Sequence, residues 1–210
     1  LIVSGDATAT AHNIIASQSL WRIGIALDLL QHVCDVGLLI VFYVLFKPVS
    51  RNLTLLAILF AAIKTAALIA TKLNQWQALF PLGNENYLQS FNPQQLHTLM
   101  YLSIRADQYG FGIGLIFFGF ACLVLGYLIY KSEFLPKLIG VLIAIAGVCY
   151  IINSFALILA PRLGSTLFPA IMVPPFIAET SFCLWLIIKG VNASKWRERA
   201  THGEQLFAVQ

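Results

Sequence analysis

The feature that most constrains this chain is a set of long, uninterrupted apolar runs. Each run is long enough to cross a hydrocarbon core of about 30 Å at 1.5 Å per residue. None alternates between apolar and polar residues, as the strands of a membrane barrel do. The sequence therefore predicts an all-α, polytopic membrane bundle with five transmembrane helices and short interfacial helices on its outer side. The predicted spans cover residues 20–46, 53–73, 109–130, 138–160 and 166–188 of a single domain, 1–210.

The composition excludes a water-soluble domain. Of the 210 residues, 59% are hydrophobic and 10% are charged, and the mean hydropathy is +0.82. A soluble domain carries roughly a quarter charged residues. The formal net charge is +4, and the excess of basic residues lies mostly in short segments between the apolar runs. That placement suits the control of topology and argues against nucleic acid as a partner.

The basic residues also predict the direction of the spans. By the positive-inside rule, the turns 47–52 and 131–137 and the tail 189–210 are cytoplasmic, whereas residues 1–19 and the loop 74–108 lie outside a bacterial inner membrane. A further span before Leu1 would return the true N-terminus to the cytoplasm. The rule compares Lys47, Arg51, Lys131, Lys137, Lys189, Lys195, Arg197 and Arg199 with Lys72, Arg105 and Arg162 on the other side.

Two outer segments carry helix-start signals. Asp6 is a good N-cap for a short helix over 7–16, and Asn92 followed by Pro93 suits the start of another. The second helix has a rough apolar face, which suits a position at the membrane surface before the third span.

Small residues predict close helix packing in two spans. In lipid, small residues spaced by four let helix backbones approach closely. We expect the third and fourth spans to be buried against neighbours, either in this chain or in another membrane subunit. The residues are Gly110 and Gly114, with Gly112, Gly119 and Gly126 out of register, and then Gly140, Ala144 and Gly147.

The first span carries a polar stripe. Asp28, His32 and Asp35 are spaced i, i+4 and i+7, so all three lie within about 60° on the helix. A carboxylate at the centre of a span opposes insertion by roughly 2.5–3.5 kcal/mol. The stripe must therefore face a protein interior or a wet cavity.

Other spans offer partners for this stripe. Counting residues places Asp35 and Glu179 near one level, roughly 20 Å below the outer boundary at 1.5 Å per residue, with Lys64 near mid-depth. A buried lysine would offset part of the cost of burying the two carboxylates. We expect a second group nearer the outer surface, formed by Arg22, Asp28, Arg105 and Asp107.

Two adjacent prolines predict a break in the last span. Pro174 and Pro175 donate no backbone hydrogen bond, which would leave the carbonyl groups of Ala170 and Ile171 without helical partners. Such a break is either a kink or part of a ligand site.

The buried polar set has several interpretations. It is a structural network that fixes helix order, or a site for a proton, an ion or a lipid-like head group. A metal is a less specific alternative, and haem is weaker because nothing pairs His97 with His32. No cofactor is predicted. The four cysteines lie singly in apolar runs and are interpreted as packing residues, and no nucleophile triad or phosphate loop occurs.

A family resemblance rests on the segments 33–36, 47–52, 109–114, 126–131, 134–136, 150–155, 178–179 and 184–185. Through these segments the chain resembles a bacterial integral-membrane family known as domain of unknown function 4386. The resemblance implies a further span before Leu1, and it brings no activity, substrate or cofactor. His32 departs from the apolar or aromatic residue expected there, which favours Asp28, Asp35 and Glu179 as site residues. Recurrent family positions include Asp6, Arg22, Asp28, Asp35, Asp107, Asn153 and Glu179.

Three functions stay open. The first is a polar site that binds a small or lipid-like ligand or protons, with membrane lipids as surroundings. The second is an accessory, non-catalytic subunit of a larger membrane complex. The third is an intramembrane enzyme acting on a lipid or isoprenoid, in which two carboxylates serve as general acid and base. The predicted ligand-binding residues are Arg22, Asp28, His32, Asp35, Lys64, Asn153 and Glu179.

Overall fold

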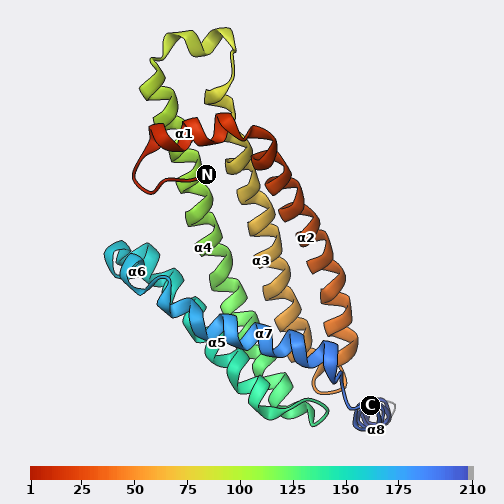
Figure 1. Cartoon of the computed structure of the whole chain (residues 1–210). Coiled ribbons are helices and arrows are strands. Elements are labelled where there is room, and N and C mark those ends of the chain that lie inside the picture. The colour runs from red at the N-terminus through yellow and green to blue at the C-terminus, as the bar shows by residue number, and fades with distance from the viewer. Residues whose placement is uncertain (208–210) are drawn as a thin grey trace. The chain divides into compact units, whose positions relative to one another are not determined.

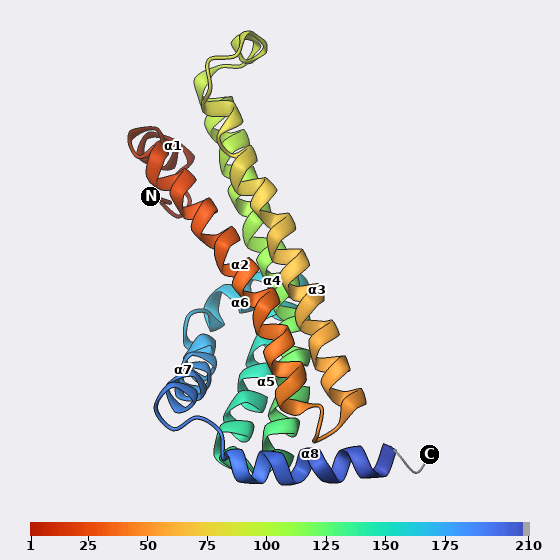
Figure 2. The same ribbon diagram turned by 90° about the vertical axis from the view of Figure 1, so that its right-hand side faces the viewer.

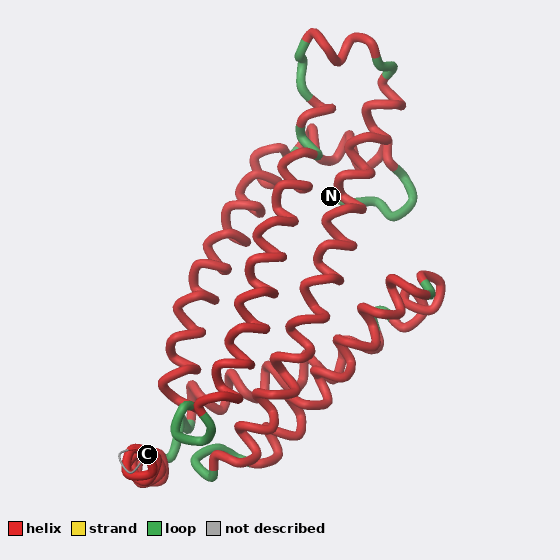
Figure 3. The backbone as a smooth tube through the Cα atoms, turned by 180° about the vertical axis from the view of Figure 1, so that it is seen from behind, coloured by secondary structure: helices red, strands yellow, loops and turns green. Residues whose placement is uncertain are grey.

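The computed structural model describes residues 1–207, and within that range it is helical, with no strand (Figures 1 and 3). Among these described residues, five helices are long and apolar enough to cross a membrane, as the apolar runs predicted. The α-helices are α1 (Ala7–Ala16), α2 (Gln18–Phe46), α3 (Arg51–Gln77), α4 (Pro93–Ser132), α5 (Lys137–Leu159), α6 (Pro161–Leu167), α7 (Val173–Ile188) and α8 (Ala193–Phe207), and the 3-10 turns are η1 (Phe80–Leu82), η2 (Asn86–Ser90) and η3 (Ala170–Met172).

Side-chain caps start α1 and α4 where the sequence placed them. The Asp6 carboxylate accepts the N–H of Ala9 at 2.8 Å. At α4, Asn92 Oδ1 accepts the N–H of Gln95, while Gln95 Oε1 accepts the N–H of Asn92, both at 2.9 Å. This reciprocal pair satisfies two backbone donors that a helix start leaves free. Both predicted caps are confirmed.

Helix α4 is one unbroken element of 40 residues. The outer segment after Pro93 and the apolar run 109–130 are parts of this single helix. The reason is local, because no proline follows Pro93 before Ser132 to interrupt the backbone hydrogen bonds.

The two adjacent prolines begin a helix instead of bending one. Pro174 and Pro175 lie in the first turn of α7, where a missing N–H costs no hydrogen bond. The carbonyl oxygen of Ala170 accepts the N–H of Val173. The prediction of a proline kink that leaves the Ala170 carbonyl unpaired is therefore wrong, since the chain already turns through α6 and η3 before α7 starts.

Contacts divide the chain into two compact units. Unit 1 comprises Leu1–Asp35 and Thr65–Phe111, and unit 2 comprises Val36–Lys64 and Gly112–Gln210. Helices α2, α3 and α4 contribute residues to both units.

Unit 1 is held by a small apolar core and by bonds from its N-terminal segment. The core contains Ala11 and Ile14 of α1 together with Met100 and Ile104 of α4. The Tyr101 hydroxyl accepts the N–H of Gly5 at 2.8 Å. The later part of α3 lies beside the first part of α4 (Figure 2), where a Cβ added at Gly110 would overlap the side chain of Thr71. A residue without a side chain is thus required at this contact.

Unit 2 is built on close packing of α4 against α5. A Cβ added at Gly126 would lie 2.6 Å from the carbonyl oxygen of Gly140, and one added at Gly147 would lie 2.6 Å from that of Gly119. We call these contacts, together with that of Gly112 on Leu157, the glycine seam. The third and fourth spans are therefore buried against each other, within this chain, at these glycines.

The spacing of the seam differs from the predicted spacing of four. The glycines of α4 that enter it recur every seven residues, as do the two of α5. Helices that run alongside each other repeat their contacts every two turns, which gives a period of seven. The glycines of α4 that are out of register with a spacing of four are therefore the ones that contact α5.

The beginning of α8 is tied to other elements of unit 2. Trp196 Nε1 donates to the carbonyl oxygen of Leu45 at 3.0 Å, and the N–H of Asn192 donates to that of Phe134 at 3.1 Å. The rings of Phe46 and Phe134 are 6.0 Å apart. The α2–α3 turn, the α4–α5 turn and the start of α8 therefore meet at one end of unit 2 (Figure 2).

Candidate functional site

A charged cluster in unit 1 centres on Lys72. Lys72 Nζ donates to Asp28 Oδ2 at 3.0 Å and lies 3.9 Å from Asp107 Oδ1. The second oxygen of Asp107 accepts Gln75 Nε2 at 2.8 Å. The side chains of Lys72 and Asp107 are only 11% and 14% exposed, against 46% for Asp28. One ammonium thus links α2, α3 and α4.

The remaining residues of the polar stripe lie further along α2. His32 Nδ1 lies 3.3 Å from Asp35 Oδ2, and the histidine is buried. This distance suits one hydrogen bond, whose direction depends on the tautomer. The stripe therefore consists of two groups, with Asp28 bound to Lys72 and His32 beside Asp35.

The two arginines expected in the outer charged group lie elsewhere. The Arg22 guanidinium is 5.2 Å from the ring centre of Trp76. Arg105 donates to the side chain of Gln108 at 3.1 Å. The prediction that Asp28 and Asp107 come together is right, but their cation is Lys72. Lys72 lies one turn before Trp76 on α3. The four-carbon stem of Lys72 carries its ammonium to the two carboxylates, while the guanidinium of Arg22 stacks on the indole of Trp76.

A second polar cluster lies in unit 2, and we call its three residues, Lys64, Tyr150 and Glu179, the α7 site. The Tyr150 hydroxyl donates to Glu179 Oε1 at 2.6 Å. Lys64 is close enough for its charge to act on the Glu179 carboxylate. Its ammonium also lies 5.0 Å from the ring centre of Phe118, which packs on Tyr150 at 5.3 Å. The three residues come from α3, α5 and α7, and α4 contributes the neighbouring ring of Phe118.

Two further polar side chains of α5 lie one turn beyond Tyr150. Asn153 and Ser154 follow it at i+3 and i+4, so they share its side of the helix. Asn153 Oδ1 and Ser154 Oγ are buried, and neither has a hydrogen-bond partner. Buried polar atoms are nearly always paired, so each of these two needs a partner such as water or a ligand.

The predicted ligand set is thus distributed over both units. Lys64 and Glu179 come together in the α7 site, and Asn153 lies one turn from Tyr150. The members in unit 1 make other contacts: Arg22 stacks on Trp76, Asp28 binds Lys72, and His32 lies beside Asp35. The predicted proximity of Asp35 to Glu179 concerns different units and stays a prediction.

Sequence reasoning missed Lys72, Gln75 and Tyr150. Lys72 lies near the end of an apolar run and was interpreted as a topology signal. Tyr150 lies inside an apolar run and looks like a packing residue, although a buried tyrosine hydroxyl normally requires a partner. That requirement is the one sequence signal that pointed to an acceptor near Tyr150.

The described part of the chain holds no group of three or more His, Cys, Asp or Glu side chains placed to bind a metal ion. The α7 site offers one carboxylate, a phenol and an ammonium. These groups suit recognition of a polar molecule by hydrogen bonds and charge.

The fold and these clusters define a class of protein, namely helical chains with five candidate spans that carry buried charged groups. Residues 1–190 match the family described as Domain of unknown function (DUF4386), and the chain belongs to that family. An uncharacterized protein of Archaeoglobus fulgidus is 31% identical over 164 residues, which are 78% of this chain and 81% of that relative. No solved structure matches the chain.

Proposed function

We propose that this chain is a multi-pass membrane protein that binds a lipid-like molecule by its polar head group at the α7 site. The observation that carries the proposal is the 2.6 Å hydrogen bond from Tyr150 to Glu179, made beside the charge of Lys64 within an apolar helical unit. Ionisable groups inside a membrane are costly and generally functional.

The chemistry of the α7 site suits a head group with both donors and acceptors. Glu179 keeps a second carboxylate oxygen beyond the one bound to Tyr150, and Lys64 supplies an ammonium donor. One turn away, Asn153 Oδ1 is a buried acceptor without a partner. A hydroxyl or amine group of a ligand would satisfy such an acceptor.

Access to the α7 site from the bilayer supports a lipid-like ligand. Phe176 and Cys183 flank Glu179 at i−3 and i+4 on the same side of α7, and both are exposed. Phe176 is 72% exposed. An apolar tail lying along these residues would place the head group at Glu179 without crossing the protein.

The charged groups of unit 1 serve in this proposal as structural links. Asp28 and Asp107 both face Lys72, whose side chain is 11% exposed. Removing one partner of such a cluster costs more than the cluster gains, since it leaves a buried charge uncompensated.

The test is copurification of a lipid-like molecule. The full chain is purified from its native membrane in mild detergent, and bound molecules are extracted and identified by mass spectrometry. We expect a specific molecule in stoichiometric amounts with the wild-type chain, and its loss in Glu179→Gln and Tyr150→Phe. Tyr150→Phe keeps the ring and its packing on Phe118, so it separates binding from folding.

The matched control is Glu85→Gln, which neutralises an exposed carboxylate with no side-chain bond in its cap. This variant should retain the molecule. An equal content of bound molecules in all four proteins would refute the proposal.

A proton is the second candidate ligand. It is favoured by the same hydrogen bond, because a 2.6 Å bond between a phenol and a carboxyl group is of the charge-assisted kind. Infrared difference spectra between acidic and alkaline buffer would then contain a carboxyl band that Glu179→Gln removes. Without such a band, this candidate fails.

The location follows from the charges of the turns. We infer a bacterial inner membrane with the α2–α3 turn, the α4–α5 turn and α8 in the cytoplasm. The positive-inside rule supports this orientation. Cysteine labelling from each side of sealed vesicles tests this orientation. The role of an accessory subunit is not favoured by any specific contact, since the glycines of α4 and α5 already pack on each other.

A further inference from the structure

The end of unit 2 at which the α2–α3 turn, the α4–α5 turn and α8 meet is strongly basic. Two acidic residues lie among these turns and α8 up to Thr201, and one of them, Glu133, faces Arg199 at 3.8 Å. We call this surface the basic end. Its exposed cations are Lys47, Arg51, Lys131, Lys137, Lys189, Lys195 and Arg197.

Helix α8 is held against the basic end by its first turn. Asn192 caps it, with Oδ1 accepting the N–H of Lys195 at 3.2 Å. Trp196 is buried in part against the core of unit 2 and bonds to the carbonyl oxygen of Leu45. Lys195 and Arg197, on either side of Trp196, stay exposed. A helix with one apolar anchor and exposed cations suits a position within a lipid headgroup layer.

Two lysines at the α4–α5 turn lie beside tyrosine rings. Lys131 Nζ lies 5.9 Å from the ring centre of Tyr127, and Lys137 Nζ lies 5.5 Å from that of Tyr130. Tyrosine is enriched at the membrane interface, and lysine next to it extends its ammonium toward the head groups. Both turns therefore present cations at one interface.

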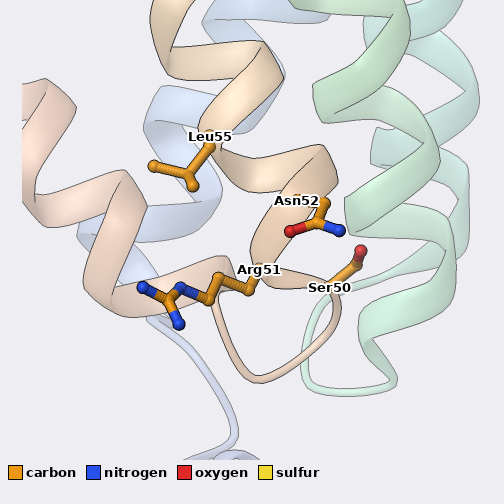
Figure 4. Close-up of a pocket in the computed structure, with 4 residues that line it drawn as sticks. All are labelled: Ser50, Arg51, Asn52 and Leu55. Carbon is orange, nitrogen blue, oxygen red and sulfur yellow. The ribbon is translucent and has the colours of Figure 1, made fainter.

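A pocket of about 440 Å³ opens at the α2–α3 turn. Ser50, Arg51, Asn52 and Leu55 line it, and all four come from the turn and the first residues of α3 (Figure 4). The first three supply hydroxyl, guanidinium and amide donors, and Leu55 supplies an apolar wall. A guanidinium together with hydroxyl and amide donors suits an anionic oxygen group such as a phosphate.

We propose that the basic end binds anionic phospholipid head groups, with α8 lying among them and one head-group phosphate seated in the pocket at Arg51. This inference concerns a different part of unit 2 from the α7 site. It therefore stands or fails independently of the ligand proposed there.

The test measures which lipids surround the full chain in a bilayer. The protein is reconstituted in phosphatidylcholine containing phosphatidylglycerol, and spin-labelled forms of each lipid report their association with the protein. We expect the wild-type chain to prefer phosphatidylglycerol. The triple variant Arg51→Gln, Lys195→Gln, Arg197→Gln should lower that preference by about twofold or more, because each cation near an anionic surface attracts it separately.

The control variant is Arg105→Gln with Arg162→Gln, which removes exposed cations outside the basic end. It should keep the preference, and added salt should weaken the preference of the wild-type chain. Circular dichroism of each variant verifies the helical fold. An equal association of both lipids with the wild-type chain, or an equal loss in the control, would overturn the proposal.

Discussion

Adding one methyl group at Gly126 tests whether the glycine seam holds unit 2 together. In Gly126→Ala the new Cβ would lie 2.6 Å from the carbonyl oxygen of Gly140 and 2.8 Å from the backbone nitrogen of Ala144. Neither contact involves a side chain that could rotate away. The two helices would have to separate by about 0.8 Å to reach an ordinary contact of 3.4 Å.

The magnitude follows from overpacking and helix propensity. Extra atoms in a well-packed core cost typically about 1–3 kcal/mol, and replacing glycine by alanine within a helix returns about 1 kcal/mol. The difference between these two terms is a loss of up to about 2 kcal/mol of unfolding free energy for Gly126→Ala. Because Gly126 and Gly140 face each other, the double variant Gly126→Ala, Gly140→Ala should lose less than twice that amount.

Gly112 and Gly24 serve as controls, because alanine is expected to change stability differently at each of them than at Gly126. A Cβ at Gly112 would meet only the end of the flexible Leu157 side chain, at 2.8 Å, and a Cβ at Gly24 would meet nothing within 4 Å. Gly112→Ala should be nearly neutral, and Gly24→Ala should gain about 0.5–1 kcal/mol.

The assay is reversible unfolding of the purified chain in mixed micelles of increasing sodium dodecyl sulfate, followed by circular dichroism. The order of stability should be Gly24→Ala, then Gly112→Ala, then Gly126→Ala. If Gly126→Ala is as stable as Gly24→Ala, the backbones of α4 and α5 are not in contact and the reasoning fails.

Three further substitutions test single bonds. Lys72→Met should lower the free energy of unfolding by about 2 kcal/mol, because Asp107 is left buried without its cation. This figure is below that of a fully buried pair because the Asp28 carboxylate is partly exposed. The double variant Lys72→Met, Asp107→Asn should recover part of the loss in the same unfolding assay. Asp6→Ala should destabilise the start of α1 by about 1 kcal/mol, which hydrogen exchange at the Ala9 amide would report as faster exchange. Trp196→Phe removes one hydrogen bond worth about 1 kcal/mol, so limited proteolysis should cut α8 sooner.

The helical architecture and several local details could be predicted from the sequence alone. Long apolar runs without alternation predict membrane-spanning helices, because few other folds can satisfy the backbone hydrogen bonds of such a run. The caps at Asp6 and Asn92 were predictable because capping depends on neighbours within four residues. The placement of Asp28, His32 and Asp35 on one side of α2 was predictable for the same reason, because it depends only on their spacing along the helix.

The pairings between helices could not be read in the same way. Lys72 and Asp28 are 44 residues apart, and nothing in the spacing of either run says which cation reaches which carboxylate. Gln75 and Asp107 face the same difficulty. Depth counting brought Lys64 and Glu179 to similar levels, but only packing decides that Tyr150 donates the short bond.

The glycine seam shows how spacing alone misleads when the partner is unknown. A period of four suits helices that cross, and a period of seven suits helices that run together. The sequence contains both periods, through Gly110 and Gly114 and through Gly112 and Gly119. Only the contact partner distinguishes them, and here that partner is α5.

The bond between Trp196 and Leu45 joins positions 151 residues apart. During synthesis the carbonyl of Leu45 is made 151 residues before its indole donor. Helix α8 can therefore dock only after the end of α2 has reached its native position. A chain that lacks Trp196 would leave this acceptor unpaired and part of the apolar core of unit 2 uncovered.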